Sequence, residues 1–425
     1  MTKNPPMVLT VVLDAVGIET VNRYMDWNRT QGRLEVAFPH LANLGFGNLL
    51  AERHNRFVPQ AATLDVALAA HPASKTADST MGHRELNGYI DPEEFPLFRE
   101  GFPREYVSVL EKIIGRPVLF NERAGGADAI NRNHDEHKRT GGIVLYSSMC
   151  DPIMQIAADE SIIPFEELNR MGETAYRVAM LMNINITRVI TRPYVDEGDH
   201  LAPDKRFTRT ENRKDIVKPM PPGTKTFVDI ARANGIYTVS IGKCAGVVNV
   251  KRGWHEDRVL SGQVPERFDF MYTTERRKDK NPNSLRETLT ALHEARNRTE
   301  PTYIMANFGD TDSLYGHKRM PGGCLQSLIA FDSALPLIQS ALPPGAIMLI
   351  TADHGMEDRG DYGYHERTAV PVLGVAADGL IRNRMSIPTN PQSYAVAGQI
   401  AAEFLGFQEQ YLRECNLQKV LPELR

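Results

Sequence analysis

The sequence has little of what marks secreted, membrane-spanning or nucleic-acid-binding proteins. Only four of its 425 residues are cysteines, and they lie too far apart to form a zinc knuckle or a redox CxxC motif. It contains no run of 18 consecutive apolar residues, so it predicts no transmembrane helix. The formal net charge of −4 provides no positive field to attract nucleic acid or an anionic membrane. We therefore expect a cytoplasmic globular protein with reduced thiols.

Short apolar runs alternate with segments of helical periodicity. The first run, 7–13, has the length of a signal-peptide core, but Asp14 follows it directly and no small-residue cleavage site comes after. The predicted strands are 7–13, 237–241, 302–308 and 346–351, and the predicted helices are 225–234, 285–298, 323–342 and 392–405. This alternation predicts an α/β fold with a mostly parallel sheet flanked by helices.

The length and the distribution of proline indicate more than one domain. A single core rarely exceeds about 300 residues, and this chain has 425. Proline-rich stretches at 91–103 and 218–223 are typical of boundaries, because proline restricts φ and removes a backbone donor. We predict a core formed by 1–100 and 222–425, with an inserted α/β cap domain at 101–221.

Carboxylate and imidazole side chains follow the predicted strands. Ligands of parallel sheets bind outside the carboxyl ends of the strands, so these side chains are expected to meet. The candidate metal ligands are Asp14, Asp312, His317, Asp353, His354 and His365. Such ligands suit Mn²⁺, Zn²⁺ or Fe²⁺, and a pair of ions about 4 Å apart can clamp both oxygens of a phosphoryl transfer. Taken singly, each residue also fits a helix cap, a turn or a solvated position; taken together, they favour a metal site.

A second candidate motif is SKTADSTMGHREL (74–86), which contains two adjacent hydroxyls, Ser79 and Thr80. A metal can activate a hydroxyl as a nucleophile by stabilising its alkoxide. By itself the motif is weak, because Ser and Thr are common in N-caps and turns.

Together, Asp14 and the runs DSTMGH, DTDSLYGH, TADHG and HERTAVPV resemble the alkaline phosphatase superfamily of metalloenzymes. More narrowly, the chain is similar to prokaryotic phosphopentomutases, which interconvert ribose 1-phosphate and ribose 5-phosphate. The narrower resemblance depends on the predicted cap, in the stretches FPREY, GGADAI, DPIMQIAADE, RPYVDEG and FTRTENRKD. Phosphatases and sulfatases of the superfamily share the metal ligands but lack this insertion.

The resemblance implies a role for each matching position. Asp14, Asp353 and His354 would hold one Mn²⁺, and Asp312, His317 and His365 the other. Counting back from Gly82 places the phosphorylated nucleophile at Ser79, with Thr80 as its rival. The substrate-binding residues implied are Asp151, Arg192, Arg213 and Lys243. In the absence of the family resemblance, the interpretation to favour is that the two arginines are ordinary surface residues and that FTRTENRKD is a solvated loop.

The implied reaction is a phosphoryl shuttle through a sugar bisphosphate, primed by an activator such as glucose 1,6-bisphosphate. Three positions depart from the family. Ser79 replaces the usual Thr, Ala77 replaces a Lys for which Lys75 offers a substitute, and Arg84 replaces a Trp. We expect the last change to place a cation near the nucleophile loop and to favour a different or more anionic substrate.

Two other functions remain open. One is a metal-dependent phosphomonoesterase, or a mutase paralogue, acting on another sugar phosphate. The other is a sugar-phosphate sensor without catalysis, which the intact ligands and Ser79 disfavour. Sequence leaves the bound metal, the preferred pentose, the direction of flux and the oligomeric state undecided.

Overall fold

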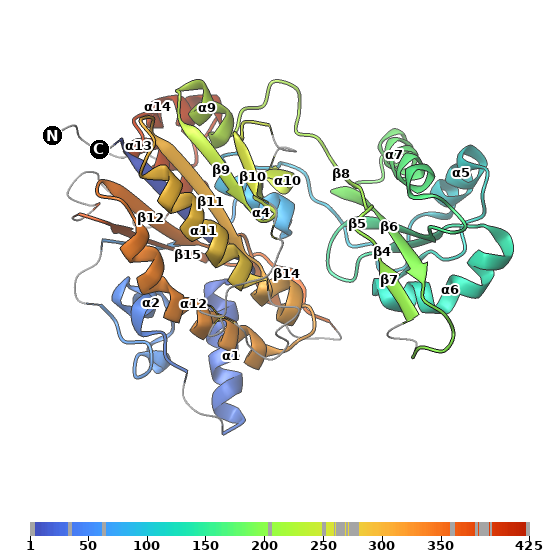
Figure 1. The fold of residues 1–425 in the computed structure, drawn as a ribbon, viewed down its shortest axis with the longest axis horizontal. Helices are drawn as coiled ribbons and strands as arrows, with labels where there is room; N and C mark the ends of the chain where they lie inside the picture. Colours follow the sequence, from blue (N-terminus) through green and yellow to red (C-terminus); the bar gives the residue numbers. More distant parts are fainter. Residues whose placement is uncertain are drawn as a thin grey trace. The chain divides into compact units, whose positions relative to one another are not determined.

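The computed structural model describes residues 5–32, 36–61, 65–202, 206–248, 252–258, 260, 268, 271, 280–357, 362–378, 381, 391 and 393–421. The chain forms two compact units. The first combines Met1–Glu93 with Met220–Arg425, and the second is Glu94–Pro219. Each unit has its own sheet (Figure 1).

The first unit contains a seven-stranded sheet in the order β10-β9-β11-β1-β12-β15-β2. Its strands are β1 (Met7–Leu13), β2 (Val66–Ala70), β9 (Tyr237–Ile241), β10 (Glu256–Arg258), β11 (Thr302–Phe308), β12 (Ala346–Thr351) and β15 (Val370–Ala376). All pairs from β10 to β12 are parallel, whereas β15 is antiparallel to both β12 and β2. Every residue of β1, β11 and β12 is buried, as expected for parallel strands covered on both faces. The four predicted strands are confirmed.

Helices pack around this sheet in two groups (Figure 1). One group is α1 (Ile18–Thr30), α2 (Pro39–Asn43), α11 (Asn281–Ala295) and α12 (Pro321–Ala341). The other is α4 (Ser79–Leu86), α9 (Phe227–Ala233), α10 (Cys244–Val248), α13 (Val396–Phe404) and α14 (Gln408–Glu414). Shorter elements are α3 (Phe46–Leu49), the 3₁₀ turn Glu52–His54, the π-helical turn Thr311–Gly316 and the paired strands β13 (Gly355–Glu357) and β14 (Tyr364–Glu366).

The four predicted helices correspond to α9, α11, α12 and α13. α11 begins earlier than predicted, because Pro282 occupies its first turn, where proline needs no backbone partner. Residue 392, at the start of the last prediction, lies outside the described residues. Within the described part of the chain, no helix combines the length and apolarity needed to cross a bilayer.

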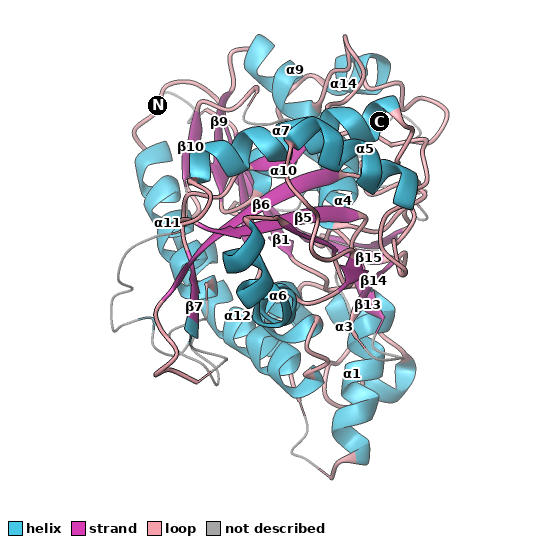
Figure 2. Cartoon of the chain, turned by 90° about the vertical axis from the view of Figure 1, so that its right-hand side faces the viewer, coloured by secondary structure: helices cyan, strands magenta, loops and turns pink. Residues whose placement is uncertain are grey.

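The second unit is also an α/β layer structure. Its strands are β3 (Glu122–Arg123), β4 (Val144–Ser147), β5 (Ile153–Asp159), β6 (Arg188–Asp196), β7 (Phe207–Arg209) and β8 (Asp215–Val217). Its helices are α5 (Arg104–Ile114), α6 (Gly126–Thr140) and α7 (Phe165–Leu181). Alternate strand residues bury on opposite faces, so Leu145 packs in the cluster of α5 and α7, and Val144 and Tyr146 pack with α6. Figure 2 shows α6 on one side of these strands and α5 and α7 on the other.

Candidate metal centre and nucleophile

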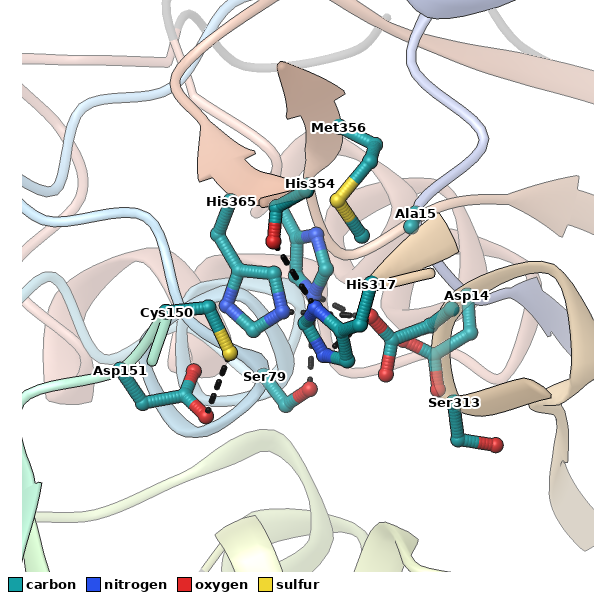
Figure 3. Close-up of polar contacts among 12 residues, drawn as sticks. Asp14, Ala15, Ser79, Cys150, Asp151, Ser313, His317, His354, Met356 and His365 are labelled. Carbon is teal, nitrogen blue, oxygen red and sulfur yellow. Dashed lines mark hydrogen bonds and ion pairs between the residues drawn. The ribbon is translucent and has the colours of Figure 1, made fainter. Parts of the chain in front are cut away.

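The parallel order of β11, β1 and β12 brings three polar segments to one sheet edge. Asp14 follows the last residue of β1, Asp312 lies shortly after β11, and Asp353 comes just after β12. All three carboxylates are buried. Figure 3 shows side chains of this edge, among them Asp14, Ser79 and three histidines, pointing toward one another.

The first donor set is Asp14, Asp353 and His354, whose candidate ligand atoms all lie within 4.8 Å of one another. His354 Nε2 is 3.6 Å from Asp14 Oδ1 and 3.4 Å from Asp353 Oδ2. The other ring nitrogen, Nδ1, faces the Gly355 carbonyl at 2.9 Å and must carry the proton, which leaves a lone pair on Nε2. Asp14 Oδ1 is buried and accepts no hydrogen bond from the described residues, and Asp353 Oδ2 is buried beside His354 Nε2 and His83 Nδ1. Three lone-pair atoms facing one another in this way fit a divalent cation.

The second donor set is centred on Asp312. Its Oδ1 is 3.1 Å from His317 Nε2 and 3.2 Å from His365 Nε2. His317 Nδ1 faces the Gly363 carbonyl at 3.1 Å, which directs Nε2 toward Asp312. The candidate ligand atoms of Asp312, His354 and His365 also lie within 4.8 Å of one another, and the ring centroids of His354 and His365 are 3.9 Å apart. His354 therefore borders both donor sets.

Local structure explains how the second set converges. His317 directly follows the π-helical turn Thr311–Gly316, in which its amide donates to the Asp312 carbonyl at 3.3 Å. His365 lies on β14, paired with Met356 of β13. The five-residue spacing of Asp312 and His317 thus comes from one wide helical turn, and an antiparallel strand pair supplies the third ligand.

The nucleophile candidates differ sharply in their surroundings. Ser79 is the first residue of α4, and its Oγ accepts a hydrogen bond from Lys243 Nζ at 2.7 Å and lies 3.4 Å from His354 Nε2. The Thr80 hydroxyl is buried with no hydrogen-bond partner in the described structure. Gly82 lets α4 approach the loop after β12 closely, because a Cβ at position 82 would lie only 1.9 Å from the Asp353 carbonyl oxygen. Ser79, not Thr80, therefore faces the donor sets.

Lys243 balances the negative charge of this edge. Its ammonium contacts Asp14 Oδ2 and is 3.8 Å from Asp353 Oδ2. Burial opposes its charge, but the surrounding carboxylates outweigh burial and raise the pKa of Lys243 above its usual value. Burial, together with the charge of Asp353, raises the pKa of Asp14 to about 7. Burial lowers the pKa of His354 to about 4, so this imidazole is neutral and able to bind metal at neutral pH.

Comparisons with known proteins agree with this geometry. The model of the metalloenzyme superfamily matches residues 7–404. A phosphopentomutase from Desulfitobacterium hafniense is 31% identical over 410 residues, which cover 94% of this chain and 96% of the relative. A phosphopentomutase from Thermotoga maritima is 30% identical over 411 residues, covering 94% and 95%. The chain belongs to the phosphopentomutase family.

Among solved structures, a phosphoglycerate mutase from Leishmania mexicana matches with a TM-score of 0.50 and 13% identity, covering 96% of each chain. At that identity the match supports the fold alone. The resemblance to phosphopentomutases of the alkaline phosphatase superfamily, the fold class and the assignment as a phosphopentomutase-like enzyme are confirmed.

The predicted substrate residues of this family member divide between the two units. Lys243 lies in the first unit with the metal donors, whereas Asp151, Arg192 and Arg213 lie in the second. Arg192 Nε donates to Gln155 Oε1 at 2.8 Å, and burial lowers the pKa of this guanidinium to about 10, with the charges of Arg209 and Arg213 acting in the same direction. Asp151 is buried, and Ser148 Oγ donates to it at 3.4 Å. Arg213 is exposed, 3.4 Å from Asp215.

Arg84, the departure from the family's tryptophan, has an unexpected position. Its side chain is buried, and its Nε donates to the Val248 carbonyl at the end of α10, at 3.2 Å. The side chain of Arg84 thus packs within the first unit between α4 and α10. The Arg84 side chain therefore contacts the backbone at the end of α10, and its effect on the choice of substrate stays a prediction.

Proposed function

We propose that this protein interconverts the 1-phosphate and 5-phosphate of ribose or deoxyribose through a phosphorylated Ser79. The observation that carries the proposal is the position of Ser79 Oγ, between the Lys243 ammonium and the His354 imidazole. A hydroxyl so placed can receive a phosphoryl group beside two sets of metal donors. The family relatives named phosphopentomutase support the sugar and the reaction type.

The proposed cofactors are two divalent ions, with Mn²⁺ favoured. Asp14, Asp353 and His354 would hold one, and Asp312, His317 and His365 the other. When bound, the ions would favour the Ser79 alkoxide and neutralise phosphoryl oxygens. Lys243 holds the Ser79 oxygen in place and supplies a positive charge that stays inside the site throughout the reaction.

The phosphoryl group moves twice. The bond between phosphorus and Ser79 Oγ breaks as a bond forms to the free hydroxyl of the pentose monophosphate, giving a bisphosphate. The sugar then presents its other phosphate, which returns to Ser79 and leaves the isomeric monophosphate. Glucose 1,6-bisphosphate would prime the enzyme by phosphorylating Ser79.

We propose that the predicted cap, 101–221, recognises the substrate, with Asp151 facing the sugar hydroxyls and Arg192 and Arg213 binding phosphate. Guanidinium groups bind phosphate oxygens in pairs, and Arg192 is held in place by Gln155.

Arg213→Ala is expected to raise the KM for ribose 1-phosphate about tenfold, since a charged hydrogen bond to phosphate is lost, with Mn²⁺ content unchanged. Steady-state kinetics and metal analysis would test this. Arg177→Ala is the matched control, because Arg177 is an exposed arginine of the same unit, 4.0 Å from Glu173. Loss of metal in Arg213→Ala would contradict the assignment of Arg213 to the substrate.

Lys243→Met is expected to lower kcat by about 10²–10³-fold, the usual effect of removing one preorganised positive group from a transition state. Both Mn²⁺ ions should stay bound, because Lys243 is not among the donors. Lys419→Met, a change at an exposed lysine, serves as control. An unchanged kcat would show that the contact between Lys243 and Ser79 has no catalytic role.

The decisive experiment for the proposed function is product analysis. Mn²⁺-loaded protein would receive ribose 1-phosphate with a trace of glucose 1,6-bisphosphate, and ³¹P NMR would follow the products. Conversion to ribose 5-phosphate with negligible inorganic phosphate is expected. Steady release of inorganic phosphate would instead establish a phosphomonoesterase, and absence of turnover would refute the pentose assignment.

A further inference from the structure

Two buried polar residues outside the predicted site connect its carboxylates. Asn307, near the end of β11, donates from Nδ2 to Asp14 Oδ2 at 3.0 Å. Its Oδ1 lies 3.1 Å from Nε2 of His83, a residue of α4. His83 Nδ1 in turn lies 2.9 Å from the Ser79 carbonyl and 3.1 Å from Asp353 Oδ2. A continuous chain of contacts thus runs from Asp14 to Asp353 and to the backbone of Ser79.

The hydrogen-bonding capacity of each group fixes the direction of this chain. A metal-binding carboxylate can only accept hydrogen bonds, so the amide NH₂ of Asn307 faces Asp14. The amide oxygen of Asn307 must then accept a hydrogen bond from His83 Nε2. The other ring nitrogen, Nδ1, faces a carbonyl and a carboxylate, which are both acceptors. Both ring nitrogens of His83 therefore face hydrogen-bond acceptors inside the chain of contacts, so neither is directed at a metal ion.

We infer that His83 and Asn307 form a positioning bridge, which holds Asp14 and Asp353 at a fixed separation and anchors both to the backbone of the nucleophile. This inference rests on the metal site of the proposed function, and not on the identity of the sugar. The bridge occupies Asp14 Oδ2, and Oδ1 remains directed at His354. It also contacts Asp353, a fully buried carboxylate, through His83 Nδ1 at 3.1 Å.

The location of the bridge explains why it would affect metal binding more than folding. Partners that orient metal ligands typically contribute 10–100-fold to metal affinity. His83 and Asn307 also link α4, which carries Ser79, to β11 and to the loop after β12. A break in the bridge would let the first donor set and the nucleophile move apart, while the set around Asp312 keeps its own contacts.

The test is Mn²⁺ binding to the full-length protein, measured by titration calorimetry, with thermal unfolding in EDTA as the measure of folding. Asn307→Leu is expected to weaken one of two Mn²⁺ sites by about 10–100-fold and to leave the other unchanged. The glutamine in His83→Gln keeps one N–H donor for Asn307, so the Mn²⁺ affinity of this variant should fall less than that of Asn307→Leu. For both variants, excess Mn²⁺ should restore kcat toward the wild-type value.

His54→Gln is the matched control, because His54 is a buried histidine of the same unit, located beside Asp26 instead of the metal donors. It should leave both Mn²⁺ affinities unchanged. If the variants at 83 and 307 only lower the unfolding temperature and keep both Mn²⁺ affinities, the bridge is refuted. His83 and Asn307 would then contribute to packing alone. A wild-type protein that binds no Mn²⁺ would refute the proposed metal site itself, which is a separate outcome.

Discussion

Replacing Ser79 by alanine is expected to abolish phosphoenzyme formation and to lower turnover by about 10⁴-fold or more, as removal of a catalytic nucleophile generally does. Ser79 Oγ is the hydroxyl that Lys243 and His354 both contact, at 2.7 and 3.4 Å. Its loss removes the phosphoryl acceptor but leaves the metal donors in place. Intact-protein mass spectrometry after incubation with glucose 1,6-bisphosphate would detect the added phosphate.

Thr80→Val is the matched control for this experiment. The Thr80 hydroxyl is buried and, within the described residues, forms no hydrogen bond, so an isosteric methyl group should leave both labelling and turnover near wild type. Labelling that persists in Ser79→Ala and disappears in Thr80→Val would assign the nucleophile to Thr80 and contradict the geometry of α4.

The second large effect is expected for Asp312→Asn. This variant should bind one Mn²⁺ fewer per chain, and its kcat should fall by about 10³-fold or more. Asp312 Oδ1 lies between the Nε2 atoms of His317 and His365, so the second donor set has its negative charge at this point. An amide has nearly the same shape but no charge, and hard divalent ions bind it far less well. Metal content by mass spectrometry and steady-state kinetics would measure both effects.

Asp310→Asn provides the control for this substitution, two residues earlier in the same segment. Both Asp310 oxygens accept backbone amides of Lys280 and Asn281, at 2.8–3.0 Å, and therefore cap the start of α11. This variant should lose some stability but no Mn²⁺. A loss of metal equal to that of Asp312→Asn would mean that the site responds to general disturbance of the loop.

Much of the sheet was predictable because its central strands are continuous apolar runs. β1, β9, β11 and β12 have the bounds that the sequence predicts. β2 and β15 were not predicted: β2 is a five-residue, alanine-rich strand, and β15 contains a proline and a glycine. β15 pairs antiparallel with β12, and β2 pairs antiparallel with β15 although the two segments are some 300 residues apart in sequence. Local periodicity cannot indicate such a pairing.

The site, like the sheet, contains residues that the sequence predicted and residues that it did not. The six metal-ligand candidates were found because they follow strands whose carboxyl ends share one edge, and the structure brings them together. His83 and Asn307 received no role, although His83 ends the quoted motif DSTMGH and Asn307 lies three residues before DTDSLYGH. A histidine or an asparagine in a motif does not reveal its partners, and theirs lie 224 and 293 residues away.

The sequence by itself determined the family, the α/β class and the chemical types of the metal ligands, because these depend on local runs of residues and their order. Only the tertiary structure placed Ser79 Oγ beside Lys243 and His354, buried Arg84 and joined Asp14 to Asp353 through Asn307 and His83. These outcomes depend on which face of α4 turns toward the sheet edge. That orientation is set by the packing of Gly82 against the Asp353 backbone, a contact between residues far apart in the chain.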